Sequence, residues 1–272
     1  MAETGERPVL PTQVGHVGPD HHRFRGFDVG RDLVGHETYW SVISLAIGGP
    51  RLAPDDSRLL DDLATSLVGP DPRIWPWKLC RLMSAYGRFS TGMAGPLIMM
   101  SSGSVGPAAL AAVARFFEEL ARELGPDDAD DAALGRALDH KLERSPRPPG
   151  FGTPFRNQDE RNAPILALVR AHGRERGRYF SLVERAAPLV LEKKQLPMNA
   201  AALVSGICLD LGFSSEQIDV FGILLLVANT VANSFEGSRT APAVLKRLPR
   251  EFVRYVGQPP RPSPRAASGK TP

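Results

Sequence analysis

Glycines and arginines set the chemistry of the stretch GFGTPFRNQDER, which begins at Gly150. Gly152 follows Phe151, and glycine permits turns and a close approach of the backbone to a ligand that other residues forbid. Arg156 and Arg161 carry planar guanidinium groups that suit bidentate contacts to a carboxylate or a phosphate. The stretch contains no obvious catalytic group, so its residue types predict a site that holds an anionic ligand.

The neighbouring carboxylates allow a second interpretation of this stretch. Asp159 and Glu160 lie next to Arg161 in the sequence and are expected to orient its guanidinium. The same charges are typical of a solvated, salt-bridged helix start. Taken alone, the stretch leaves both interpretations open.

Helices are the elements that must position these residues. Apolar residues recur at helical spacing along the chain, and prolines, aspartates and glycines mark the limits of the periodic segments. No segment alternates convincingly as a strand, so we predict an almost wholly α-helical protein. The expected helices cover residues 39–47, 57–67, 77–86, 107–124, 132–142, 163–173, 179–194, 200–211 and 215–235.

One uncharged stretch, residues 90–114, is long enough to span a bilayer. Serines, glycines and two prolines interrupt it, which favours two short buried helices around the turn SSGSVGP. The apolar run over 220–232 is too short to span, and the N-terminus lacks the layout of a signal peptide. We therefore expect a cytoplasmic protein that does not engage a membrane.

Composition excludes several classes of protein. The 272 residues can bury a large core, and 33 basic against 30 acidic side chains give a formal charge of +3. Without a basic stripe or a groove-reading helix, this charge is weak support for nucleic-acid binding. Cys80 and Cys208 lie in apolar patterns without zinc-ligand spacing, which indicates two buried, reduced thiols and no metal site.

The two ends of the chain and one internal segment differ in composition from the rest. The first twenty or so residues and the end from Gln258 are rich in proline, glycine, serine and charge, which is typical of tails. Prolines and glycines over residues 145–152 favour a domain boundary, although a simple loop has the same composition.

Several motifs occur in an order known from one enzyme family. GFGTPFRNQDER is followed by LEKKQLPMNAAALVSGICLDLGF and then by RLPREFVRYVG. This order resembles the citrate synthase family, including its short relatives that cleave citryl-CoA, where "GFGH" precedes Asp-x-Arg, "LPxNVD" and "RPRxxYxG". Upstream, GSVGPAALAAVARFFEEL is similar to the family segment "GPLHGGANEAxxxxLEEL". The resemblance covers residues 26–257.

The resemblance implies an all-α, citrate-synthase-like fold with a large helical domain and a smaller inserted helical domain. It also implies a homodimer and a ligand site in the cleft between the domains. The expected division is a disordered N-terminal tail over 1–23, the first part of the large domain over 24–144, the small domain over 145–221, a return to the large domain over 222–257 and a disordered C-terminal tail over 258–272.

The family pattern breaks at its catalytic positions. Citrate synthases need a base to remove a proton beside a thioester carbonyl and a neutral histidine to steady the enol. The family aspartate falls on Ala201, and the two histidines fall on Gly106 and Thr153. A further histidine is missing, because its region reads GPDPRIWPW. The resemblance therefore implies that the acid/base set is absent.

The binding half of the family pattern is retained in part. Arg161 matches the arginine of Asp-x-Arg, and Arg250 matches the first arginine of the ending that grips a substrate carboxylate from a neighbouring subunit. A third family arginine falls on Leu226. We expect Arg161, Arg250 and Arg156 to bind substrate. Gly150, Phe151 and Gly152 are expected to lie against CoA.

Other candidates for chemistry have more ordinary interpretations. His36 beside Glu37 is a possible displaced base, but a helix-start histidine with a local partner is the simpler interpretation. The run Asp20-His21-His22 lies in the expected tail and lacks a fourth ligand for a metal. Trp75 and Trp77 either belong to the core or fill the emptied cleft with apolar surface.

Two functions from different classes remain open. The first is a repurposed enzyme of carbon–carbon bond chemistry, of acyltransferase or lyase type, that takes a CoA thioester as substrate and holds no tightly bound cofactor. The second is a pseudoenzyme that binds a small-molecule carboxylate or acyl-CoA, or that pairs with an active, related subunit as a heteromer. Citrate formation by the standard mechanism is disfavoured, because several cooperating groups are missing.

Overall fold

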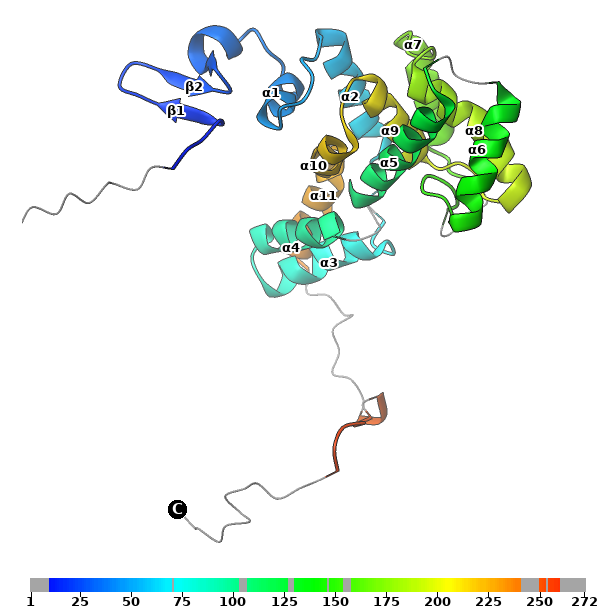
Figure 1. The fold of residues 1–272 in the computed structure, drawn as a ribbon. Helices are drawn as coiled ribbons and strands as arrows, with labels where there is room; N and C mark the ends of the chain where they lie inside the picture. The colour runs from blue at the N-terminus through cyan, green and yellow to red at the C-terminus, as the bar shows by residue number, and fades with distance from the viewer. Residues whose placement is uncertain are drawn as a thin grey trace, which may run out of the picture.

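The computed structural model of the chain describes residues 10–69, 71–102, 107–126, 130–145, 147–153, 158–240, 250–252 and 254–259. Helices dominate these residues and gather into one body (Figure 1), which confirms the prediction of an all-α protein. The helices are α1 (Tyr39–Ala46), α2 (Pro54–Ser66), α3 (Trp75–Tyr86), α4 (Phe89–Ser102), α5 (Pro107–Leu124), α6 (Asp131–Arg144), α7 (Asn162–Ala171), α8 (Arg178–Lys194), α9 (Ala200–Asp210), α10 (Ser215–Leu225) and α11 (Val227–Gly237).

Local capping chemistry sets where several helices begin. The side chains of Thr38 and Asp130 each accept a hydrogen bond from a backbone N–H in the first turn of α1 and α6. Before α10, Ser214 and Gln217 each accept a bond from the other's backbone N–H. Such caps satisfy N–H groups that have no partner inside the helix, so the polar residues before each apolar run locate the helix starts.

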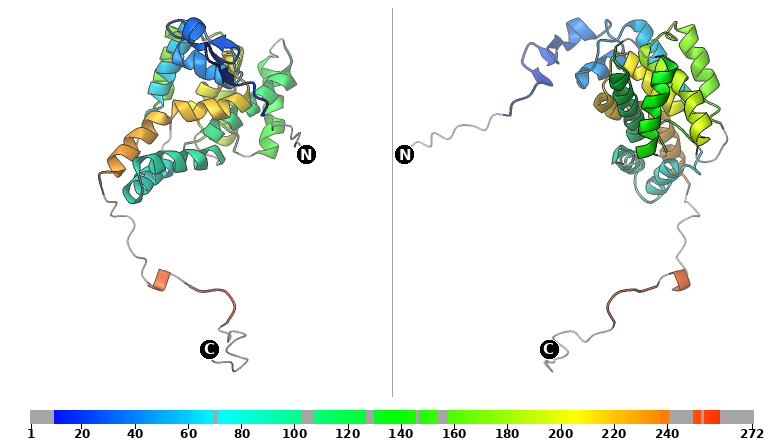
Figure 2. Two further views of the ribbon diagram at one scale, coloured as in Figure 1. Left: turned by 90° about the vertical axis from the view of Figure 1, so that its left-hand side faces the viewer. Right: turned by 45° about the vertical axis from the view of Figure 1, so that its right-hand side comes forward.

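The centre of the body is built around α5 and α9. Helix α5 packs against α9 and α10, and its Phe117 and Leu120 are completely buried. Helix α9 is buried around its whole circumference, because residues 202–209 are all buried, and it contacts α5, α7 and α8 (Figure 2). A helix that is hydrophobic on every face belongs in the interior of a protein, and α9 lies there.

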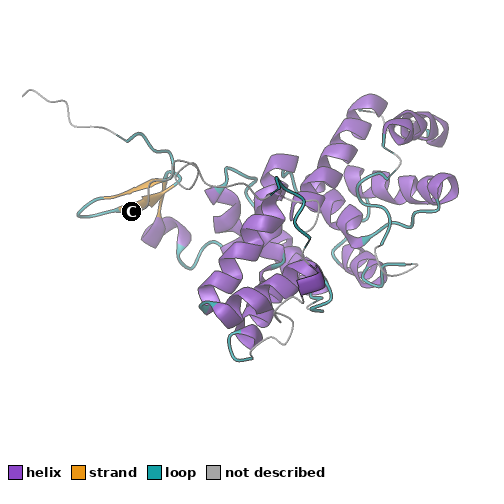
Figure 3. Ribbon diagram, turned by 90° about the horizontal axis from the view of Figure 1, so that it is seen from below, coloured by secondary structure: helices purple, strands orange, loops and turns teal. Residues whose placement is uncertain are grey.

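Helices α3, α4 and α11 form a second packed group, which lies at the bottom of the body in Figure 1 and is seen from below in Figure 3. Two glycines allow their backbones to approach closely. A Cβ atom on Gly92 of α4 would collide with Ser84 of α3, and one on Gly237 of α11 would lie 2.5 Å from the Cα of Arg81. The backbones of α4 and α11 therefore both lie close to α3 at these glycines.

A small antiparallel sheet precedes the helices. Strands β1 (Gly15–Val17), β2 (His22–Phe24) and β3 (Phe27–Asp28) pair in that order. The expectation that no segment forms a strand is wrong here, and the sheet begins within the residues expected to be a tail. Strands of two or three residues are too short for alternation to be visible in the sequence. Arg25 ties the sheet to α1 by donating from Nε to the Ala46 carbonyl at 3.1 Å.

The apolar helical segments differ in how far they are buried. The expected pair over residues 90–114 is found as α4 and α5, but α4 exposes Phe89 and Ile98 instead of being buried. In the described part of the chain, one helical segment, Ser215–Gly237, is long and apolar enough to cross a membrane by composition alone. Half of its apolar window is buried inside the fold.

Both cysteines are buried, as the sequence predicts, and should be unreactive in the folded protein. Complete burial raises the pKa of Cys208 to about 12, and burial also raises the pKa of Cys80. Because the thiolate is the reacting form, we expect no rapid labelling by a disulfide reagent such as DTNB near pH 8. Two thiols should react once the chain is unfolded in guanidinium. Rapid labelling of the native protein would contradict this prediction.

Candidate functional site

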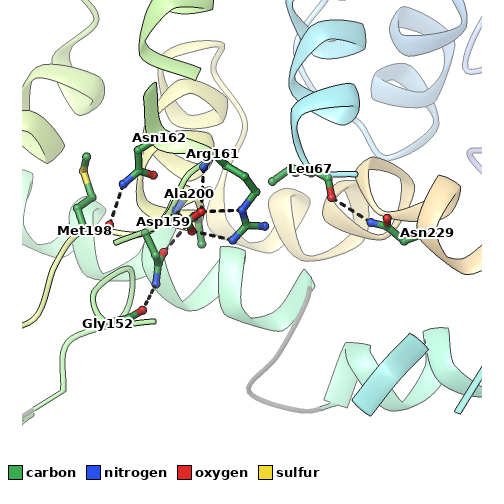
Figure 4. A network of polar contacts seen from close by, with 10 residues as sticks. Leu67, Gly152, Asp159, Arg161, Asn162, Met198, Ala200 and Asn229 are labelled. Carbon is green, nitrogen blue, oxygen red and sulfur yellow. Dashed lines mark hydrogen bonds and ion pairs between the residues drawn. The ribbon is translucent and has the colours of Figure 1, made fainter. Parts of the chain in front are cut away.

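The expected ligand stretch contains a buried carboxylate that fixes Arg161 (Figure 4). The Asp159 side chain is only 3% exposed, and it pairs with Arg161 through two parallel hydrogen bonds. Nε of Arg161 donates to Oδ1 at 2.8 Å, and Nη2 donates to Oδ2 at 2.7 Å. This bidentate arrangement fixes the plane of the guanidinium. The bonds to Asp159 use Nε and Nη2, and the Arg161 side chain remains 39% exposed.

Asp159 also holds the start of α9. Its Oδ2 accepts a hydrogen bond from the backbone N–H of Ala200 at 2.9 Å, and its Oδ1 accepts one from the N–H of Arg161 at 3.2 Å. Burial by itself raises the pKa of this carboxyl, but Arg161 and the Ala200 N–H outweigh burial and hold the pKa below its ordinary value. Asp159 is therefore ionised at neutral pH and cannot act there as a proton donor.

The glycine-flanked turn pairs with a distant part of the chain. Gly152 donates to the Pro197 carbonyl at 2.7 Å, and the N–H of Asn199 donates to the Gly150 carbonyl at 3.0 Å. Both glycines have positive φ, 88° and 86°, which a residue with a side chain rarely adopts. Between them Phe151 is buried, with its ring centroid 6.4 Å from that of Phe117. The glycines thus place an aromatic ring in the core.

Two asparagines complete the connection between the turn and the helices. Asn199 donates from Nδ2 to the Gly152 carbonyl at 3.0 Å, while its Oδ1 caps α9 by accepting from the Ala201 N–H at 3.0 Å. Asn162, at the start of α7, donates from Nδ2 to the Met198 carbonyl at 2.8 Å. We define the Asp159 network as Gly152, Asp159, Arg161, Asn162 and Asn199. It joins the turn, α7 and the first turn of α9.

The structure brings together only some of the expected site residues. Arg161 and the turn from Gly150 to Gly152 share the Asp159 network. Arg250 is exposed in a short 3₁₀ turn, Arg250–Phe252, and residues 250–252 and 254–259 lie apart from the helical body in Figures 1 and 2. Arg250 therefore does not meet Arg161 within this chain. Arg156 and Gly106 lie outside the described residues.

The positions of the missing family catalytic groups can be located in part. Ala201 is half-buried in the first turn of α9, and Thr153 directly follows the glycine turn. The N–H groups of Ala200 and Ala201 already have acceptors in Asp159 and Asn199. The start of α9 therefore does not offer these two amides to a developing oxyanion.

The arrangement favours anion binding over proton transfer. Arg161 presents a fixed cation, but the adjacent Asp159 is a carboxylate that already offsets its charge. Within the described ranges, no group of three histidine, cysteine, aspartate or glutamate side chains is placed to hold a metal ion. The site can hold a carboxylate or phosphate at the outer edge of Arg161, and its described side chains supply no neutral base for acid/base work.

The remaining candidates lie elsewhere. His36 lines a cavity of about 360 Å³ between the starts of α1 and α2, where Glu37 accepts hydrogen bonds from Ser41 and Arg51. A neighbouring cavity of about 390 Å³ lies beside Trp40. Of the two tryptophans whose place was left open, Trp77 belongs to the buried core, whereas Trp75 is partly exposed.

Sequence reasoning missed the asparagines of this network. In the sequence, Asn199 stands out only as part of the motif LPMNA, and Asn162 belongs to no motif. An asparagine immediately before an apolar helix is a recognisable N-cap, so Asn199 carried a usable signal. Asn162 carried none, because its partner lies 36 residues away in the sequence.

The helices and their order define a citrate-synthase-like fold. No protein-family model and no curated protein sequence matches the chain. Among solved structures, it is similar to a citryl-CoA lyase from Hydrogenobacter thermophilus, with 22% identity, a TM-score of 0.74, and coverage of 96% of this chain and 100% of that one.

Two further structures support the same fold. An ATP citrate lyase from Methanothrix soehngenii in complex with citrate and coenzyme A has 16% identity and a TM-score of 0.68, over 98% of this chain and 44% of that one. A citrate synthase from Thermoplasma acidophilum has 15% identity and a TM-score of 0.58, over 85% of this chain and 60% of that one. At these identities the likeness establishes the fold.

Proposed function

We propose that this protein binds an acyl-CoA or a small carboxylate and acts on it as an enzyme of carbon–carbon bond chemistry. The observation that carries the proposal is the bidentate fixing of Arg161 by Asp159 beside the turn at Gly152. A fixed guanidinium with one free edge binds a carboxylate or phosphate at a low cost in entropy. The similar solved structures include a citryl-CoA lyase and a lyase in complex with citrate and coenzyme A.

The proposed chemistry is not citrate formation by the standard route. Ala201 and Thr153 occupy positions where the resembling family carries an aspartate and a histidine, and neither side chain can take a proton near neutral pH. The reaction would then depend on a group of the substrate itself or on a displaced side chain. A retro-aldol or Claisen-type cleavage belongs to this class of chemistry.

A second function, a pseudoenzyme that binds the same ligands, is favoured by a different observation. The polar groups of the Asp159 network mainly bind one another, so the retained residues also serve the fold. In this role the protein would sense a carboxylate or acyl-CoA, or would pair with an active, related subunit.

The proposal includes the wider organisation expected from the resemblance. Residues 145–221 would form the small domain, and its cleft with the large domain would hold the ligand beside Arg161. Two copies would form a homodimer in which Arg250 of one chain reaches the cleft of the other, consistent with its position apart from its own helical body. The CoA thioester would be a substrate rather than a resident cofactor, and the protein would act in the cytoplasm.

Calorimetry with acetyl-CoA, free CoA, oxaloacetate and citrate tests the binding proposal. We expect micromolar binding of at least one ligand, weakened at least about tenfold in Arg161→Lys, because lysine keeps the charge but loses the planar donor pair. Arg250→Ala should weaken binding similarly. Arg31→Ala, which removes an exposed arginine of the N-terminal region, is the matched control and should bind like wild type.

Incubation with citryl-CoA separates the two functions. Formation of acetyl-CoA and oxaloacetate, followed by chromatography, would support the enzyme. Binding without any product from citryl-CoA or related thioesters would favour the pseudoenzyme. If none of the four ligands binds, the shared binding proposal is wrong. Circular dichroism on each variant checks that the fold is retained.

A further inference from the structure

Two histidine side chains meet at the β1–β2 hairpin, in the small sheet that precedes the helices (Figure 1). Nδ1 of His16 lies 3.1 Å from Nε2 of His21, and the two ring centroids are 5.2 Å apart. Four of the six histidines of the chain fall within residues 16–36, but no sequence motif joins His16 to the run that begins at Asp20. The fold therefore creates a pair of facing imidazole nitrogens.

Strand pairing fixes the backbone at His16 and separates this residue from His22. His16 lies opposite Arg23 in the antiparallel ladder, and Val17 lies opposite His22. Opposite residues in such a ladder point to the same face of the sheet, and successive residues alternate between the faces. His16 and His22 therefore belong to different faces. Although His22 is adjacent to His21 in the sequence, it is not a member of the pair.

The turn between the two strands positions the ring of His21. The Gly18 N–H donates to the His21 carbonyl at 2.9 Å and closes the turn. A Cβ atom on Gly18 would lie 2.3 Å from Cε1 of the His21 ring, so the ring packs directly against the glycine. The absence of a side chain at Gly18 makes room for the imidazole. The ring is thereby held in place before any ligand arrives, which lowers the entropic cost of binding.

The separation of the two nitrogens fits a shared metal ion. Imidazole nitrogen binds zinc at about 2.0–2.1 Å, so an ion equidistant from His16 Nδ1 and His21 Nε2 would make an angle of about 100° with them. This angle lies between those of square-planar and tetrahedral coordination. Without a metal, one neutral ring donates its N–H to the other. Metal binding then requires only that this proton moves to the second nitrogen of its own ring, which leaves both rings neutral.

We propose that His16 and His21 form a binding site for a late first-row divalent cation, which binds Cu²⁺ more tightly than Zn²⁺ and does not bind Mg²⁺. Imidazole suits copper and zinc, whereas magnesium requires oxygen ligands. His16 is exposed and His21 is partly exposed, so water can fill the remaining coordination positions. Within the described ranges, no third histidine, cysteine, aspartate or glutamate completes the site. With two protein ligands, we expect micromolar affinity.

A bound ion would connect β1 to the turn that follows it. Because the ion binds the folded hairpin in preference to a chain in which the two nitrogens are apart, it stabilises the hairpin by mass action. Zn²⁺ should therefore slow hydrogen exchange of the backbone over residues 15–24 and leave the exchange of the helical body unchanged. The site shares no residue with the Asp159 network, and the proposal does not depend on ligand binding or catalysis.

Calorimetric titration of the untagged full chain with Cu²⁺, Zn²⁺ and Mg²⁺ tests the site. Wild type should bind one Cu²⁺ or Zn²⁺ per chain. His16→Ala and His21→Ala should each raise the dissociation constant at least about tenfold, because one imidazole remains. His22→Ala and His140→Ala remove exposed histidines outside the pair and should bind like wild type. A wild type that binds neither ion, or that binds Mg²⁺ equally well, would overturn the proposal, as would unchanged binding by His16→Ala.

A glycine substitution tests the geometry while both histidines are present. The Cβ atom of Gly18→Ala would displace the His21 ring, so this variant should bind Zn²⁺ at least about tenfold more weakly without unfolding. Gly30→Ala has room for its Cβ atom and is the matched control. Circular dichroism checks the fold of each variant. Binding by Gly18→Ala that equals wild type would overturn the assigned geometry.

Electron paramagnetic resonance of the Cu²⁺ complex provides a readout that a purely structural role of the histidines would not change. The spectrum of wild type should show two coordinated nitrogens per copper, and that of His16→Ala or His21→Ala should show one. A wild-type spectrum with a single nitrogen, or two nitrogens retained in either variant, would overturn the proposal.

Discussion

Replacing Asp159 with alanine is expected to lower the free energy of unfolding by about 3 kcal/mol. The substitution removes the acceptor for the Arg161 side chain and for the N–H at the start of α9. Removing one partner of an ion pair costs more stability than the pair contributes, because the remaining charge is left without a partner. Partial exposure of Arg161 to water reduces this cost. Urea denaturation followed by circular dichroism at neutral pH measures the change.

The effect of Asp159→Ala should depend on pH in a defined direction. The folded state holds the pKa of Asp159 below its ordinary value of about 3.9, so folding favours the ionised form. The stabilising contribution is therefore complete above that value and is lost as the pH falls through it toward the folded pKa. Denaturation curves at several acidic pH values should show the difference between wild type and variant shrinking.

Asp139→Ala is the matched control for this prediction. Asp139 pairs with Lys193 on the surface, where its side chain is mostly exposed, and such pairs contribute less than about 1 kcal/mol. An equal loss of stability in both variants would contradict the role assigned to the Asp159 network.

Phe151→Ala is expected to cost about 3 to 4 kcal/mol of stability, while Phe151→Leu should cost about 1 kcal/mol. The ring is buried against Phe117, and alanine would leave a cavity beside α5. Thermal and urea denaturation measure both variants. Tyr39→Ala removes an aromatic ring that is mostly exposed and should change stability by less than about 0.5 kcal/mol.

The same variants separate a core role of Phe151 from a ligand role. If Phe151→Ala unfolds like wild type but no longer binds a CoA species, the ring acts on the ligand and the structural assignment is wrong. If stability falls and Phe151→Leu retains binding, the aromatic ring serves the core. The glycine turn would then contribute to ligand binding only by placing Arg161.

Most helices could be predicted from the sequence because their signals are local. The limits of α5 agree with the predicted 107–124, where a proline begins the helix and Gly125 with Pro126 ends it. Helix α10 and helix α11 were predicted as one segment, since the break at Leu226 lies within a continuous apolar run. Propensity and periodicity do not register a change in direction inside such a run.

Contacts between distant segments could not be predicted in the same way. The glycines around Phe151 pair their backbone with Pro197 and Asn199, more than forty residues later, and no local pattern indicates these partners. A positive φ is predictable from glycine, but what approaches the turn depends on tertiary packing. The orientation of α11 is a similar case, because Asn229 faces inward to reach the end of α2.

The burial of residues 202–209 in α9 has a consequence for the order in which the chain can fold during synthesis. Helices α5, α7 and α8 all pack against α9, which follows each of them in the sequence. A nascent chain that ends before Asp210 would leave three apolar helix faces without their shared partner. Stable tertiary structure in the central body must therefore wait until more than three quarters of the 272 residues have left the ribosome, and chaperones would have to protect those faces until then.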